Sequence, residues 1–206
     1  MPAFTTLTRL VATLALGAAL ALPAAAAEWK VIEDEPEPRV GPWVVNGCTI
    51  EPGTQCPGVD LRHADLAGAK LNGANLRGAN LARADLRLAE LKGADLSGAD
   101  LRGATLEKVM LQGVKAPGAD FTGADLDFSR MAGADMTGAD LTAASMEFVW
   151  APKARFVGAR LTSAHLQEAK FYHSDFADAA MEGAQIRYAI WEGVHMEGCT
   201  GCPFDW

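Results

Sequence analysis

The residue types closest to reaction chemistry are four cysteines. They form two pairs, one before and one after a long repeat in the sequence. The C-terminal pair, Cys199 and Cys202, has the spacing of a thiol redox motif. Such a motif works when a helix N-terminus or a cation lowers the pKa of its first thiol. No strand-helix-strand pattern surrounds this pair, so the sequence favours a structural disulfide, with a thiol redox protein as an alternative.

A second group that could carry chemistry contains two histidines and one aspartate. His173, Asp175 and His195 would meet at one edge of a fold that repeats every twenty residues. Two imidazoles and a carboxylate can hold a transition metal. Polar side chains on the outside of a repeat protein are usually solvated, however. The sequence therefore predicts a protein that is not an enzyme and that has no catalytic residue, no metal and no cofactor.

These positions depend on a repeat of five residues that runs from Leu61 to Met196. Every fifth residue is large and apolar, except Ala116 and Ala151, and a small residue stands two positions before each of them. A spacing of two places both on one face of an extended segment, whereas a period of five does not fit an α-helix. Each pentad therefore predicts one short side with two inward residues, followed by a corner at which glycine allows a positive φ.

The corners that lack glycine show how many pentads make one turn. One series keeps a single glycine and reads Gly68, Leu88, Lys108, Phe128, Phe148, Glu168, Tyr188. The neighbouring series, which begin at Gly73 and Gly78, keep most of their glycines. The true period is therefore twenty residues. This period predicts four sides per coil and about seven coils, in an all-β rod of roughly 34 Å.

Several pentads spell a recurring motif of Ala, then Asp or Asn, then Leu, as in Ala64-Asp65-Leu66 and Ala74-Asn75-Leu76. Here the chain closely resembles the pentapeptide-repeat family. The resemblance implies a right-handed quadrilateral parallel β-helix, a solenoid, and it transfers no catalytic residue. Known family roles include mimicry of duplex DNA against type II topoisomerases, so inhibition of such an enzyme is an alternative function.

The N-terminal part differs from the repeat in composition. Residues 1–27 contain Arg9, an apolar run and three alanines before Glu28, which is typical of a secretory signal peptide. The run is too short for a membrane span. We therefore expect a periplasmic or secreted protein with no transmembrane span in the mature chain.

Four further segments follow the predicted signal peptide. Residues 28–42 are acidic and contain proline, as in a flexible tether. Residues 43–60 are expected to form an N-terminal cap, residues 61–198 the β-helix, and residues 199–206 a C-terminal cap. A rod of roughly 34 Å keeps the two cysteine pairs too far apart to bond to each other. Export therefore predicts the disulfides Cys48–Cys56 and Cys199–Cys202.

Acidic residues form rows along the predicted rod. One row reads Asp60, Asn80, Asp100, Asp120, Asp140, and the next reads Asp65, Asp85, Thr105, Asp125. Rows of carboxylates can imitate phosphates. Arginines interleave with them, however, and a signal peptide would remove the protein from cytosolic topoisomerase. Nucleic acid is therefore an unfavoured partner and DNA mimicry an unfavoured role.

The corner series that keeps only one glycine predicts a binding surface, which we call the side stripe. It consists of Leu88, Met110, Phe128, Arg130, Phe148, Trp150, Lys170, Tyr188 and Ile190. Exposed aromatics next to arginine are typical of interaction surfaces. Alternatively, these side chains lie flat over a distorted corner or pack under the tether. The favoured hypothesis is an exported, non-catalytic scaffold that binds an unknown protein partner or a second copy of itself.

Overall fold

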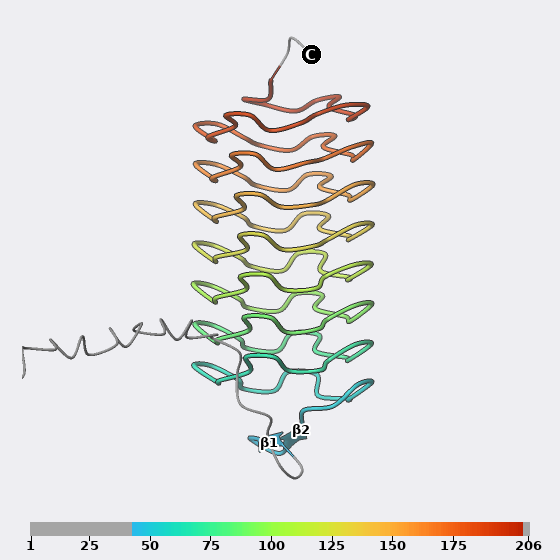
Figure 1. The fold of residues 1–206 in the computed structure, drawn as a ribbon, viewed down its shortest axis with the longest axis vertical. Coiled ribbons are helices and arrows are strands. Elements are labelled where there is room, and N and C mark those ends of the chain that lie inside the picture. Colours follow the sequence, from blue (N-terminus) through green and yellow to red (C-terminus); the bar gives the residue numbers. More distant parts are fainter. Residues whose placement is uncertain (1–42, 204–206) are drawn as a thin grey trace, which may run out of the picture. The chain divides into compact units, whose positions relative to one another are not determined.

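The computed structural model describes residues 43–203, which form a stack of coils along one axis (Figure 1). Parallel β-bridges join residues twenty positions apart, from Gln55 with Asn75 to Ala180 with Thr200. The bridges recur every five residues, so four of them belong to each turn. Within this part of the chain there is no helix, and hence none that could cross a membrane. The predicted signal peptide, the tether and residues 204–206 lie outside the described residues.

Each pentad closes one tight turn, as Leu101 to Ala104 illustrates. The Ala104 N–H donates to the Leu101 carbonyl at 3.0 Å, and Gly103 has a φ of 62°. A positive φ at the third residue is typical of a type II turn. The Arg102 N–H has no backbone partner among the described residues, and it donates instead to Asp100 Oδ1 at 3.1 Å.

The same side-chain cap recurs along the chain and explains why the pentads prefer aspartate or asparagine. Both side chains readily accept a hydrogen bond from the backbone two residues later. The capping residues are Asp60, Asp65, Asn75, Asn80, Asp85, Asp95, Asp100, Asp120, Asp125, Asp135, Asp140 and Asp175.

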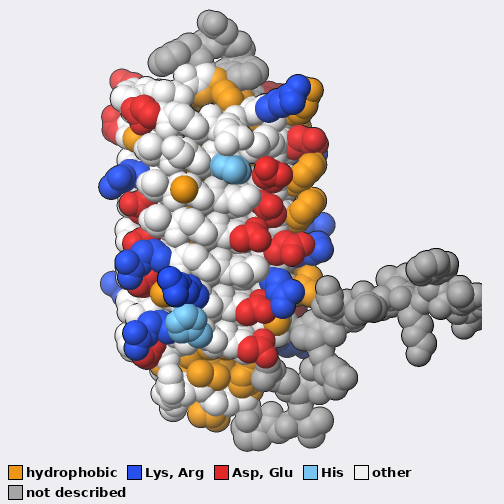
Figure 2. Space-filling model, turned by 90° about the vertical axis from the view of Figure 1, so that its left-hand side faces the viewer, with side chains coloured by type: hydrophobic (Ala, Val, Ile, Leu, Met, Phe, Trp, Pro, Cys, Tyr) orange, Lys and Arg blue, Asp and Glu red, His pale blue; other side chains and the backbone are white. Residues whose placement is uncertain are grey.

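The interior is filled by the two inward residues of every pentad. From Leu66 to Met181 all of them are buried, which confirms the predicted inward faces. Near the C-terminal end Phe156, Phe171, Phe176 and Trp191 form an aromatic core, in which Phe156 stacks on Phe176 with ring centroids 4.6 Å apart. The charged side chains therefore lie on the outer surface (Figure 2).

A short hairpin covers the start of the coil stack. Its strands, β1 (Val44–Val45) and β2 (Cys48–Thr49), pair antiparallel. They are joined by Asn46 and Gly47, which both have positive φ, as the tightest hairpin turns require. Trp43 and Val45 pack against the core beside the buried Cys48. The hairpin therefore shields the apolar interior at this end.

The bridge ladder extends beyond the predicted limits of 61–198 at both ends. It begins at Gln55, within the expected N-terminal cap, and reaches Thr200, within the expected C-terminal cap. The ladder extends further than the side-chain repeat because a bridge needs only backbone groups. It can therefore form even where the inward residues depart from the repeat. Thr54 and Cys56, for example, replace the usual pair of small and large residues.

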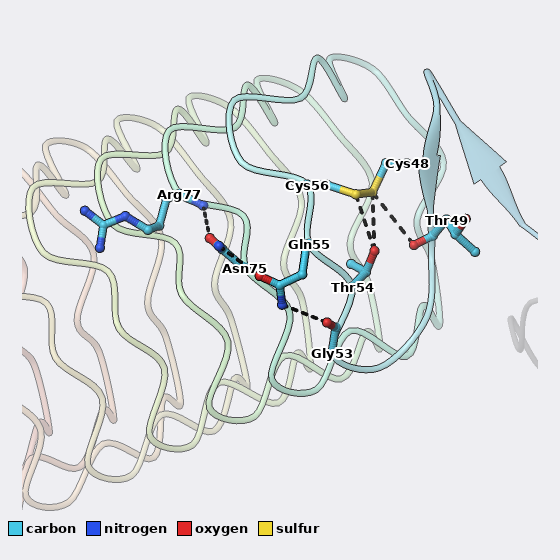
Figure 3. The surroundings of a disulfide bond; sticks show 8 residues. All are labelled: Cys48, Thr49, Gly53, Thr54, Gln55, Cys56, Asn75 and Arg77. Carbon is cyan, nitrogen blue, oxygen red and sulfur yellow. Dashed lines mark hydrogen bonds between the residues drawn. A yellow bond between two sulfur atoms is a disulfide. The ribbon is translucent and has the colours of Figure 1, made fainter.

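Both cysteine pairs are joined locally. Cys48 is bonded to Cys56 and Cys199 to Cys202, with Cα separations of 5.8 and 5.9 Å. At the first bond the Thr54 hydroxyl lies 3.3 Å from the Cys56 sulfur (Figure 3). The neighbouring Gln55 side chain donates to the Gly53 carbonyl and accepts from Asn75 in the next coil. The N-terminal disulfide thus ties the hairpin to the first coils.

We expect that a charge at an inward small position unfolds the coil stack. Ala124→Asp would place a carboxylate at a fully buried position without a partner, at a cost of several kcal/mol. The matched control is Ala132→Asp, because Ala132 is a half-buried residue on the outside of a turn. Thermal unfolding should show a large loss for the first variant and little change for the second. Equal stability of Ala124→Asp and the parent would contradict the fold.

We expect peptide mapping of the protein isolated from cells to find Cys48 linked to Cys56 and Cys199 linked to Cys202. Reduction should lower the free energy of unfolding by about 2–3 kcal/mol for the Cys48–Cys56 loop and by less for the shorter Cys199–Cys202 loop, since each bond restrains the unfolded chain. Double replacement of Cys48 and Cys56 by alanine separates the contribution of the hairpin from that of the other end. Four free thiols, or a link between the two ends, would contradict the account.

Candidate functional site

The side stripe follows one bridge ladder and the corner beside it. Met110, Arg130, Trp150, Lys170 and Ile190 are consecutive members of one ladder. The corner residues Leu88, Phe128, Phe148 and Tyr188 stand two positions before ladder residues of their own coils. All four corner side chains are exposed.

The corner keeps its regular backbone although it has lost its glycines. Phe128 and Phe148 have φ values of 59° and 57°, close to the 63° of Gly98 at another corner. A distorted corner is therefore excluded as the explanation of the side stripe. A residue other than glycine pays about 1–2 kcal/mol for this left-handed conformation. The large side chains therefore stand at corners where the left-handed backbone conformation is unfavourable for them.

Three aromatic residues of the side stripe meet in one cluster. The rings of Phe128 and Phe148 lie parallel with centroids 4.9 Å apart, which matches the spacing of successive coils. The exposed fractions of Phe128, Phe148 and Trp150 are 48%, 43% and 43%. Together with Arg130 these residues line a shallow pocket of about 340 Å³. We call this set of four residues the aromatic pocket.

Two lysines lie beside rings of the aromatic pocket. Lys108 Nζ lies 5.9 Å from the ring centroid of Phe128, and Lys170 Nζ lies 5.9 Å from that of Trp150. Both distances allow a cation-π attraction. The exposed Arg130 forms no ion pair with another of the residues 43–203. Its charge is therefore available to a ligand in the pocket.

The remaining side-stripe residues do not join the aromatic pocket. Lys108 separates Leu88 from Phe128 in the corner series, and Glu168 separates Tyr188 from Phe148. Met110 and Ile190 are only partly exposed. The predicted stripe is therefore not one continuous apolar surface.

Tyr172 is a neighbour of the pocket that the sequence pattern did not indicate. Its ring lies 5.6 Å from that of Trp150 in a tilted arrangement. The available signal was an aromatic residue at an outward turn position, two residues after Lys170 in the sequence.

The two flanks of the aromatic pocket differ in charge. Glu107, Asp127 and Glu147 immediately precede the corner residues on one side. Asp127 accepts hydrogen bonds from the Ser145 hydroxyl and the Glu147 N–H. Burial, together with the charges of Asp127 and Glu107, raises the pKa of Asp125 beside this column. The opposite flank carries Lys170 and the exposed Lys153.

The acidic rows are largely paired with arginines. Arg62 contacts Asp60 at 2.7 Å and Arg87 contacts Asp85 at 2.7 Å. The hydrogen bond from Arg62 lowers the pKa of Asp60 to about 2, and the hydrogen bond from Arg87 lowers that of Asp85. Further along the rod Arg102 contacts both Asp100 and Asp120, and Arg160 contacts Asp140. These rows therefore do not present the uniform negative charge of a nucleic-acid backbone.

Of the candidate metal ligands, the structure pairs only Asp175 and His195. His195 Nδ1 lies 2.9 Å from Asp175 Oδ1, and this hydrogen bond raises the pKa of His195. The ring of His173 packs over Gly193 instead, where an added Cβ would overlap it. Across the described part of the chain, no three His, Cys, Asp or Glu residues are placed to hold a metal ion.

Comparison with solved structures finds other coil stacks of this type. A trypsin-treated variant of QnrB1, a plasmid-mediated fluoroquinolone resistance protein, is 20% identical, with a TM-score of 0.57 over 71% of this chain and 84% of that one. HetL, a pentapeptide-repeat protein involved in heterocyst differentiation regulation in the cyanobacterium Nostoc, is 25% identical over 73% of this chain and 88% of that one, with a TM-score of 0.24. The first likeness supports the fold alone. A comparison with curated proteins gives no match.

The sequence profile of pentapeptide repeats matches the chain in overlapping segments. They are residues 54–93, 69–107, 107–142, 119–156, 139–178 and 154–190. The matched region covers more than half of the chain and coincides with the ladder of bridges twenty residues apart. The fold is accordingly a right-handed β-helix. The chain belongs to the pentapeptide-repeat family.

Proposed function

We propose that this protein is an exported, non-catalytic scaffold that binds a protein partner, or a second copy of itself, through the side stripe. The aromatic pocket is the part of the stripe that makes the contact. In this proposal the β-helix has a four-sided cross-section and about seven coils, which hold the pocket residues at fixed spacing. The protein acts in the periplasm or outside the cell after loss of residues 1–27.

The observation that carries the proposal is the exposure of Phe128, Phe148 and Trp150 around Arg130. The few residues that carry most of the binding energy at protein interfaces are enriched in tryptophan, tyrosine and arginine, and phenylalanine is also enriched in interface cores. Phe128 and Phe148 stand on a corner whose backbone conformation disfavours them. Such a cost is understandable when the side chains serve binding, although other corners, such as Ala143 and Lys153, also lack glycine.

A scaffold role is supported by the way the chain fills its own interior. The inward residues are packed without polar groups that converge on one point, and the outer surface is built from short sides and corners. Enzymes usually need a concave site with converging acid, base or nucleophile. The signal-like composition of residues 1–27 and the two local disulfides favour export.

The two alternatives have weaker support. A thiol redox role would need accessible sulfurs, whereas Cys199 and Cys202 are buried, with exposed fractions of 8% and 5%. Mimicry of DNA, as an inhibitor of a type II topoisomerase, would need free carboxylates, whereas the acidic rows are paired with arginines.

The test is a double variant, Phe148→Ser with Trp150→Ser, which removes two walls of the aromatic pocket. We expect near-parental thermal unfolding, because both side chains lie on the surface. We also expect at least tenfold weaker binding, as for the loss of two aromatic anchors. Binding is read by analytical ultracentrifugation for self-association and by quantitative capture from envelope extract for a partner.

The matched control is Leu88→Ser with Tyr188→Ser, which changes the same corner outside the pocket. It should leave association and capture close to the parent values. If the pocket variant and the parent behave alike in both measurements, the aromatic pocket is not the binding surface.

A further inference from the structure

Two adjacent columns of outward side chains run along the side stripe. Over successive coils the corner column contains Lys108, Phe128, Phe148, Glu168 and Tyr188, and the ladder column contains Met110, Arg130, Trp150, Lys170 and Ile190. In each coil the ladder residue stands two positions after the corner residue. Each of these coils therefore presents one residue of each column at about the same level.

The middle coils would make favourable contacts if the corner column of one chain faced the ladder column of another. Arg130, which is exposed and forms no ion pair within residues 43–203, would then lie over Phe128 in a cation-π contact. Phe148 would lie against Trp150, and such aromatic pairs stabilise a contact beyond the area that they bury. The second chain would thus cover the rings that a single chain leaves half-exposed.

Opposite charges also meet in this arrangement. Glu168 would face Lys170 one coil further on, and Glu147 on the acidic flank would lie beside Lys153 on the basic flank. None of these four side chains forms an ion pair with another residue in the described part of the chain. Each of them would therefore gain a partner of opposite charge.

The arrangement corresponds to one particular symmetry. A two-fold axis parallel to the coil stack exchanges the two columns and keeps every coil at its own level, so each pair forms twice. A perpendicular two-fold axis would set the acidic flank of one chain, with Asp127 and Glu147, against the same flank of the other. Like charges in contact disfavour such a complex, and the net charge of −8 already makes two chains repel each other. The charges therefore favour the parallel arrangement.

We propose that a second copy of this chain occupies the aromatic pocket, in a parallel two-fold dimer that sets the corner column of each copy against the ladder column of the other. This inference rests on the proposed function of the aromatic pocket and names its partner. The pocket is shallow in one copy, and the second copy supplies its missing wall. The two columns span about 19 Å from Lys108 to Tyr188, at a coil spacing of about 4.8 Å. This length is short for a stable interface, so the dimer is weak and reversible.

The experiment is zero-length carbodiimide coupling in a mixture of ¹⁵N-labelled and unlabelled full-length chains. The reagent joins a lysine to a carboxylate in direct contact, and an isotopically mixed product shows that the two groups come from different copies. Peptide mapping should find mixed products that join Glu168 to Lys170. Lys115, which is exposed on a different ladder, is the internal control and should give several-fold less mixed product.

The other outcomes of the coupling experiment contradict the proposal. Mixed products that join Lys108 to Glu168 would show that the columns run antiparallel. Equal mixed coupling of Lys115 and Lys170 would show that the copies collide without a defined contact. The lack of any mixed product would exclude the dimer.

A charge swap tests the pair of Glu168 and Lys170 itself, with sedimentation equilibrium as the measurement. Glu168→Lys would replace attraction by repulsion at both symmetry-related positions, so association should weaken about tenfold. Adding Lys170→Glu restores opposite charges in the parallel dimer only, so the double variant should associate like the parent. Both side chains are exposed, so thermal unfolding should change little. Failure of the second change to restore association would overturn the parallel arrangement.

The failure of this inference is distinguishable from that of the proposed function. A chain that stays monomeric at every concentration overturns the dimer alone, provided that capture of a partner from envelope extract is lost in Phe148→Ser with Trp150→Ser. If neither capture nor self-association depends on the aromatic pocket, the proposed function fails as well.

Discussion

The register of coil on coil is the constraint on which the rest of the structure depends. From Leu61 to Met181 the N–H of each large inward residue bonds to a carbonyl of the next coil, as Leu101 does with Asp120 at 2.7 Å. Stacking at this register places small residues above small and large above large, so each level buries a similar apolar content. Backbone pairing and inward packing constrain only some of the five residues in each pentad, so the outward residues can vary. A functional site therefore has to consist of outward residues.

Much of the fold follows from the sequence because the five-residue side-chain repeat has the same length as one side of a coil. Residues such as Leu66 and Ala69 are buried because this repeat places them on the inward face, as their spacing predicts. The ends were less predictable: Gln55 and Thr200 join the ladder although the pentads around them depart from the repeat. Backbone pairing there depends on the coil beneath and on the hairpin, and neither appears in a side-chain pattern.

The sequence predicted which residues of the candidate site stack in columns, but it did not predict which of them form one surface. Stacking by twenty correctly aligned Phe128 with Phe148 and Arg130 with Trp150. It could not show that Met110 is half-buried or that Tyr172 reaches Trp150, because the direction of a long side chain depends on its neighbours. Nor did it show that aspartates such as Asp100 cap the turns. Their apparent resemblance to a row of phosphates therefore has a local structural cause.

In the proposed function, the large residues at this corner serve binding and contribute little to folding. The most direct test is the free energy of unfolding of Phe128→Gly with Phe148→Gly. Glycine relieves a backbone cost of about 1–2 kcal/mol at each left-handed corner, and this gain offsets the loss of the stacked pair, about 0.5–1.5 kcal/mol, together with the apolar area that the half-exposed rings cover. We therefore expect the double variant to stay close to the parent in free energy of unfolding. A loss of several kcal/mol would show that the rings are corner packing and would contradict it.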